Sequence, residues 1–130
     1  AALLFIDISG FTASMERFAR LGSQGIEKFW KMFNSYFCDL LDVIQVKCGD
    51  VDCFAGDAIL ITPDGLPVGK LALATMAACQ CGKNLLEKLS PYYFNDDTTE
   101  AVLTLHGSIG SGGIRTVDIG GQVLEVRYCV

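Results

Sequence analysis

The sequence has 130 residues and is 51% hydrophobic, with 15 acidic residues against 10 basic ones and a net charge of −5. This length suits one domain with its own hydrophobic core, so residues 1–130 are predicted to form a single domain. The acidic balance argues against a nucleic-acid binder, and no apolar run reaches the roughly 18 residues of a transmembrane segment. Because no signal peptide opens the chain, we expect a cytoplasmic protein.

A strand is predicted over residues 2–8 (ALLFIDI), whose short continuous apolar run is typical of a strand buried on both faces. Asp7 lies near its end, where a buried carboxylate requires a cationic or hydrogen-bonding partner. Gly10 ends the strand, and the segment TASMERFARL predicts a short helix from about Thr12. Ser9 and Thr12 are both candidate N-caps of that helix.

A loop is predicted at residues 22–25, and a long amphipathic helix follows it. Apolar residues recur there at three- and four-residue steps, which is the spacing of a core-facing helix. They are Ile26, Phe29, Trp30, Phe33, Phe37, Leu40, Leu41 and Ile44. The segments VDCF and AILIT then predict a hairpin with Asp57 at or beside its turn. A further helix is predicted at residues 69–89, which are rich in small side chains.

Residues 91–99 are predicted to form a polar loop. Strands are predicted at 101–109 and 123–130, separated by a Gly-rich stretch at 110–121. The order βααββαββ predicts an α+β sandwich of the ferredoxin-like type, with the helices packed on a mainly antiparallel sheet. Strand-like sequence at both ends indicates a piece of a longer protein, truncated at the C-terminus.

Asp57 is the best candidate companion for Asp7, because the first strand and the central hairpin are neighbours in a ferredoxin-like sheet. Two carboxylates at one place repel each other unless a cation joins them. Mg²⁺ or Mn²⁺ fits, because such hard cations commonly bind one or two carboxylates plus substrate phosphates. The helix start would offer amides to a phosphate through Ser9, Gly10, Phe11 and Thr12. The alternative is that Asp7 caps the helix and Asp57 forms the turn.

The segments LLFIDISGFTASMERF and CGDVDCFAGDAILI together resemble the catalytic domain of class III nucleotidyl cyclases. The resemblance is closest to the first cyclase domain of the bicarbonate-responsive soluble adenylyl cyclases. It implies conversion of ATP to 3′,5′-cyclic AMP and pyrophosphate by two-metal catalysis. It also implies two Mg²⁺ or Mn²⁺ ions on the Asp7 and Asp57 carboxylates and the Ile8 carbonyl, with the triphosphate on the amides from Gly10 to Thr12.

The sequence departs from this family at Cys53, where the family usually has a purine-reading lysine or glutamate. Cysteine is too short to replace lysine, and its thiol is a weak donor. The asparagine and arginine that serve the transition state in the family normally lie beyond Val130. The resemblance therefore implies the metal-bearing half of a site that a second cyclase domain completes, in the same chain or in a dimer mate. In the soluble adenylyl cyclases the corresponding degenerate site binds bicarbonate, and because Cys53 occupies a lining position of that site, the resemblance does not settle whether bicarbonate regulates this chain.

Two other functions are alternatives to that of a cyclase half-site. A catalytically silent cyclase-homology domain could serve dimerisation or regulation, which the loss of lysine at Cys53 favours and the presence of both Asp7 and Asp57 opposes. A haloacid-dehalogenase-type phosphatase also begins with a strand-end aspartate, but it needs a second aspartate where this chain has Ser9.

Other reactive side chains are interpreted as structural. The six cysteines are Cys38, Cys48, Cys53, Cys79, Cys81 and Cys129. They lack zinc-finger spacing, so we expect buried thiols in a reducing compartment rather than disulfides or a metal site. His106 is interpreted as a structural strand residue and Arg115 as a solvated one.

Overall fold

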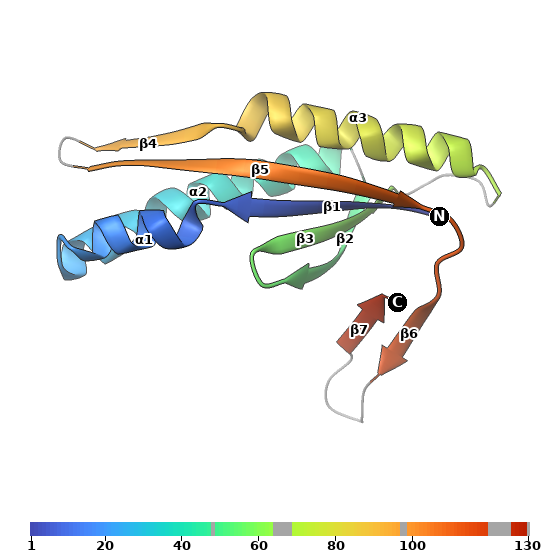
Figure 1. The fold of residues 1–130 in the computed structure, drawn as a ribbon, viewed down its shortest axis with the longest axis horizontal. Helices are drawn as coiled ribbons and strands as arrows, with labels where there is room; N and C mark the ends of the chain where they lie inside the picture. The colour runs from blue at the N-terminus through green and yellow to red at the C-terminus, as the bar shows by residue number, and fades with distance from the viewer. Residues whose placement is uncertain (48, 64–68, 97–98, 120–125, 130) are drawn as a thin grey trace.

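The computed structural model describes residues 1–47, 49–63, 69–96, 99–119 and 126–129 (Figure 1). Its helices are α1 (Phe11–Ala19), α2 (Ser23–Lys47) and α3 (Leu71–Leu89). Its strands are β1 (Ala2–Ser9), β2 (Gly49–Ala55), β3 (Ala58–Pro63), β4 (Tyr92–Asp96), β5 (Thr99–Ser111), β6 (Thr116–Ile119) and β7 (Val126–Cys129).

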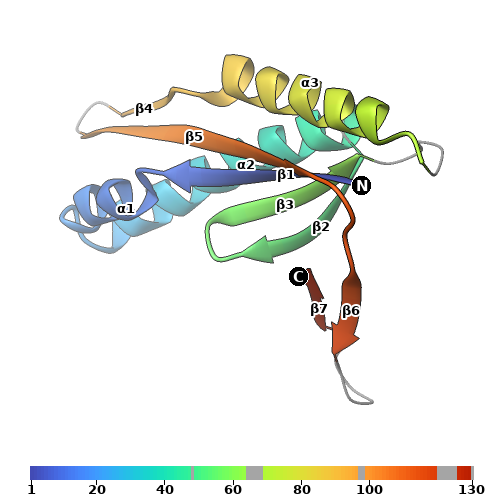
Figure 2. The ribbon, with the colours of Figure 1, turned by 45° about the vertical axis from the view of Figure 1, so that its right-hand side comes forward.

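Five strands form one antiparallel sheet in the order β2-β3-β1-β5-β4, so the first strand lies at its centre. The three helices pack on one face of this sheet, which confirms the predicted α+β sandwich. The strands β6 and β7 pair only with each other and form a hairpin that projects away from the sheet (Figure 2). None of the helices in the described ranges has both the length and the apolar character needed to cross a membrane.

The prediction that the first strand is buried on both faces is wrong. Burial alternates along β1, where Leu4, Ile6 and Ile8 face the helices and are almost fully buried. Phe5 points to the opposite face and is 38% exposed. The cause is the one-sided helix layer, because successive side chains of a strand point to opposite faces. Asp7 therefore lies on the open face, half-buried, and not in the core.

Three local predictions also differ from the structure. The polar loop predicted at 91–99 contains β4, because alternate residues Tyr92 and Phe94 pack on the core although polar residues follow them. Of the loop predicted at 22–25, residues 23–25 already belong to α2, which begins at Ser23. The Gly-rich stretch at 110–121 contains the end of β5 and all of β6. Of the strand predicted at 123–130, residues 126–129 are β7, and the rest lie outside the described residues.

The expectation of buried thiols without disulfides is wrong at Cys81, which is disulfide-bonded, and at Cys38 and Cys79, which are exposed. Cys81 is fully buried and disulfide-bonded. Cys38, Cys53 and Cys79 are reduced thiols, and Cys48 lies outside the described residues. The cysteine spacing in the sequence does not by itself reveal this disulfide.

The core tyrosine of α2 gives a pH-dependent prediction. Tyr36 is fully buried, and its hydroxyl donates a hydrogen bond to the Leu89 carbonyl at 3.4 Å. Burial first, and the nearby Tyr92 second, raise the pKa of Tyr36 above its ordinary value. A pKa raised in the folded state stabilises the fold fully below the unfolded pKa of about 10 and progressively less above it.

We therefore expect the free energy of unfolding to fall as the pH rises above about 10, and to fall less steeply in Tyr36→Phe. Urea denaturation of both proteins between about pH 8 and 11 measures the difference. Below the unfolded pKa of about 10, the variant should be less stable by about 0.5–1.5 kcal/mol because the hydrogen bond to Leu89 is gone, and this difference should shrink at higher pH. Equal slopes in the two proteins would contradict the assignment to Tyr36.

Candidate functional site

The two predicted carboxylates lie at one end of the sheet, Asp7 on β1 and Asp57 in the turn that precedes the adjacent strand β3. β1 pairs antiparallel with β3, and this register places Asp7 opposite Ala58. Asp57 lies in the turn between β2 and β3, and its carbonyl accepts a hydrogen bond from the Ile8 amide at 3.3 Å. Figure 1 shows this turn beside the end of β1 from which α1 begins. Residues far apart in the sequence are thus brought together, as the ferredoxin-like fold predicted.

The Ile8 carbonyl faces the same turn. In an antiparallel ladder, the amide and carbonyl of one residue point to the same neighbouring strand. The Ile8 amide bonds to Asp57, so its carbonyl also points to the hairpin. On the other side, the amide of Leu105, which lies opposite Ile8, donates to the Ser90 hydroxyl at 2.9 Å. The backbone therefore directs one carbonyl oxygen toward the turn that carries Asp57.

Asp7 and Asp57 have no ion-pair partner among the described residues. Asp7 is half-buried and Asp57 is exposed. The described ranges also contain no group of three or more His, Cys, Asp or Glu side chains that could enclose a metal ion. Two carboxylates and one carbonyl are hard oxygen ligands, which suits a cation that also binds water and phosphate oxygens. The donor set fits Mg²⁺ or Mn²⁺.

Helix α1 begins directly after this strand end. Its N-cap is Gly10, at φ +91°, and not Ser9 or Thr12 as the sequence predicted. The first intrahelical bond runs from the Ser14 amide to the Gly10 carbonyl at 3.0 Å. The amides before Ser14 therefore remain available at the positive end of the helix dipole. This arrangement suits an anion.

Gly10 also has a packing role that the sequence did not reveal. A Cβ atom at this position would lie 2.5 Å from the Val102 carbonyl oxygen of β5. The turn between β1 and α1 therefore touches the neighbouring strand directly. Any side chain at residue 10 would push the start of α1 away from the sheet.

The Phe11 side chain anchors the same turn to helix α2. Its ring lies 5.3 Å from Phe29, 6.0 Å from Trp30 and 4.8 Å from Phe33, measured between ring centroids. All three contacts are edge-to-face, which is a favourable geometry for aromatic pairs. The start of α1 is therefore held by aromatic packing below it and by the close approach of Gly10 to β5.

The fold gives His106 a neighbour that the sequence does not predict. The register of β1 with β5 places His106 directly opposite Asp7. Opposite residues of an antiparallel pair lie on the same face, with Cβ atoms about 4.5–5.5 Å apart. His106 is exposed, as a residue on the open face must be. Only the strand register reveals this neighbour, because nothing in the sequence near His106 points to Asp7.

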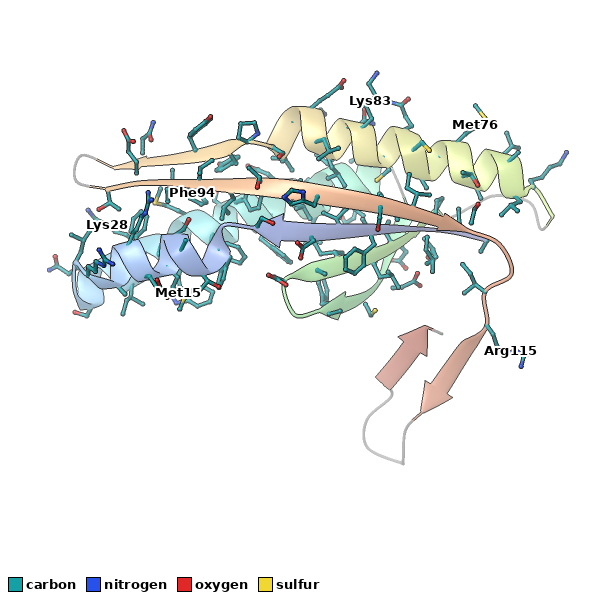
Figure 3. All side chains as sticks on the ribbon, viewed as in Figure 1. Met15, Lys28, Met76, Lys83, Phe94 and Arg115 are labelled. Atoms are coloured by element: carbon teal, nitrogen blue, oxygen red, sulfur yellow. The ribbon has the colours of Figure 1, made fainter. Side chains whose placement is uncertain are left out.

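Two other singled-out residues lie away from the strand end. Arg115 is exposed and lies just before β6, beyond the far end of the sheet (Figure 3). Cys53 is half-buried on the edge strand β2, opposite Leu60, next to a β-bulge between Val51 and Cys53. Such a bulge re-aims the side chains that follow it.

Part of the sequence is similar to known enzymes. Adenylate cyclase type 10 of Rattus norvegicus is 40% identical over 60 residues, which is 45% of this chain and 4% of that protein. The protein of the same name in Homo sapiens is 38% identical over 60 residues, with the same coverage. The chain thus spans a small part of these curated relatives. No protein-family model matches it.

Solved structures with a similar fold cover nearly the whole chain. The adenylyl cyclase CyaB from P. aeruginosa matches with a TM-score of 0.69 at 17% identity. The guanylate cyclase domain of RhGC from Catenaria anguillulae, solved in complex with GTP, matches with a TM-score of 0.64 at 18% identity. Each match covers 99% of this chain and 64% of the other. At this identity the likeness establishes the fold.

Proposed function

Because this chain has the fold of class III adenylyl and guanylyl cyclase domains, and part of its sequence is similar to adenylate cyclase type 10, we propose that it is the metal-binding half of an adenylyl cyclase. Such an enzyme converts ATP to 3′,5′-cyclic AMP and pyrophosphate. The observation that carries this proposal is the hydrogen bond between Ile8 and Asp57, which joins the turn to the strand end that bears Asp7.

Each residue at the strand end has a separate task in this proposal. The Asp7 and Asp57 carboxylates and the Ile8 carbonyl hold two Mg²⁺ or Mn²⁺ ions, which when bound neutralise phosphate charge and acidify the attacking hydroxyl. The amides from Ser9 to Thr12 receive the triphosphate at the N-terminus of α1. Gly10 keeps the backbone there close to β5, so the amides keep a fixed direction.

The proposed site is incomplete without a second cyclase domain. The side chain at Cys53 is too short to read a purine in the way a lysine does, so the base must be recognised by the partner. The partner would lie elsewhere in the same chain or in a dimer mate. The choice of ATP over GTP therefore depends on residues outside this chain, and a cytoplasmic location stays a prediction.

Cys53 also supports a second candidate function. A cyclase-homology domain that only dimerises or regulates has no need of a purine-reading residue, and such a domain could accept cysteine there. The two carboxylates without a protein cation argue for the catalytic reading, because a silent domain gains nothing from keeping them close. The two functions differ in one measurable property, which is product formation.

The test is cyclic nucleotide production by the full-length protein in its longest obtainable form, supplied with Mn²⁺ and either ATP or GTP. We expect cyclic AMP from ATP, and much less product from the 130-residue chain alone because the completing domain is missing. Mass spectrometry of the products separates cyclic AMP from cyclic GMP. Absence of both products with every divalent metal would assign the domain to the regulatory class.

A further inference from the structure

A second feature of this end of the molecule is an apolar pocket of about 350 Å³ between the helices and the β2–β3 turn. Its walls are the aromatic side chains of α1, α2 and β2, and its rim is the Asp57 carboxylate. The residues that line it include Phe11, Trp30, Phe33, Phe37, Phe54 and Asp57. This volume lies within the range of about 300–1,000 Å³ that is typical of small-molecule sites.

The aromatic rings that line the pocket contact one another. Phe37 of α2 meets Phe54 of β2 at 5.7 Å, so the helix and the hairpin are joined at the pocket wall. Phe33 is 6.0 Å from Trp30 and 5.8 Å from Phe37, also between centroids. The pocket is therefore built from three different elements that support one another.

Two of these rings are exposed to solvent. Trp30 is 44% exposed and Phe54 is 55% exposed, whereas Phe29, which belongs to the core on the same helix, is fully buried. Exposing large aromatic surfaces to water is unfavourable. A ligand that covered Trp30 and Phe54 would recover that free energy.

Charge decides which kind of ligand fits. Asp57 is the single charged side chain among the described residues that line the pocket. The faces of aromatic rings are electronegative and attract cations, and so does a carboxylate. An anion would be repelled by both, and a neutral molecule could gain a hydrogen bond to Asp57 but no charge attraction.

We propose that this pocket binds a small organic cation with a flat apolar body, with its charged group at Asp57 and its body against Trp30 and Phe54. This goes beyond the proposed function. Since Asp57 is also the proposed metal ligand, the organic cation and the metal compete for the same carboxylate. An organic cation bound in the pocket would thus inhibit metal binding at Asp57.

The single tryptophan of the chain provides a direct measurement. Trp30 lines the pocket, so its fluorescence reports on occupancy with no need for catalysis. The titration uses benzyltrimethylammonium as the probe and neopentylbenzene as its neutral isostere, with a chelator present and no nucleotide. We expect a saturable change with the cation and at least a tenfold weaker response to the neutral isostere.

Three variants locate the site. Asp57→Asn should weaken binding of the cation about tenfold, and Phe54→Leu should weaken it severalfold, because each removes one of the two attractions. Tyr93→Leu is the matched control, since Tyr93 is 66% exposed on β4 and away from the pocket. Its affinity should equal that of the unmodified chain. Circular dichroism checks that each variant is folded.

Several results would overturn the proposal. Equal affinity for the neutral isostere, or unchanged affinity in Asp57→Asn, would show that charge plays no part. The absence of any saturable change up to the solubility limit would show that the pocket does not bind this class of ligand. A signal that depends on protein concentration would indicate a second copy of the chain on Trp30 instead. None of these results bears on cyclic AMP production, which is measured separately.

Discussion

Asp7→Asn is expected to lower cyclic AMP production by the full-length protein about 1,000-fold, with the fold intact. Asparagine keeps the shape of the side chain but removes the charge that a divalent cation requires, and such charge stabilisation is worth several kcal/mol in the transition state. Asp7 is half-buried, and the described residues contain no group of three or more His, Cys, Asp or Glu side chains that could hold the metal in its place. The measurement is the initial rate at saturating Mn²⁺ and ATP.

Asp57→Asn tests the second proposed metal ligand independently and should lower cyclic AMP production to a similar extent. The matched control is Asp39→Asn, because Asp39 is an exposed carboxylate on α2, which is not part of the strand end. It loses the same charge and should keep its rate within about twofold. Full activity in both site variants would contradict the two-metal half-site and leave the regulatory function.

The free energy of unfolding gives a further contrast for the same variants. Asp7 on β1 and Asp57 in the turn before β3 are both acidic and lie at the same end of the sheet. Removing one charge should therefore leave stability unchanged or raise it slightly. A large loss of stability in Asp7→Asn would mean that the residue serves the fold and that the loss of activity follows from unfolding.

The second large effect is expected for Gly10→Ala, which should lower the free energy of unfolding by about 3 kcal/mol or more. Two costs combine at this position. The backbone has φ +91°, which disfavours any L side chain, and the added Cβ would meet the Val102 carbonyl at 2.5 Å. The new methyl group therefore forces α1 away from β5. Urea denaturation measures the change.

Gly22→Ala is the matched control for this experiment. Gly22 also has a positive φ, of +80°, but an added Cβ there would meet no described atom within 4 Å. Its cost should be that of the backbone conformation alone, about 1 kcal/mol. Equal losses in the two variants would show that β5 yields easily, and that Gly10 serves only the turn.

The resemblance to class III cyclase domains is confirmed by the fold, and its two motifs occupy the expected places. The strand ending at Asp7 and the hairpin turning at Asp57 were both predicted from apolar runs bounded by Gly-containing segments. The helix predicted from Ile26 onward is the core helix α2. These elements were predictable because their apolar spacing is local and strong. The roles of Asp7, Ile8, Asp57 and the amides of residues 9–12 stay predictions.

Two errors came from burial that the sequence does not encode. Strand β4 was missed because Asn95 and Asp96 mask the alternation of Tyr92 and Phe94, and only packing on the core identifies it as a strand. Asp7 was expected in the core because its neighbours are apolar. The sheet carries helices on one face only, so Asp7 lies at the open face.

The sequence by itself determined the order of the elements and the positions of the carboxylates, because hydrophobic periodicity and turn residues act over a few positions along the chain. The tertiary structure alone decided which groups meet. It set Asp57 against Ile8, His106 opposite Asp7, and Gly10 against Val102. It also gathered the rings of α1, α2 and β2 into one pocket at Asp57. Strand register and helix packing depend on the whole core at once, and so no local pattern can specify them.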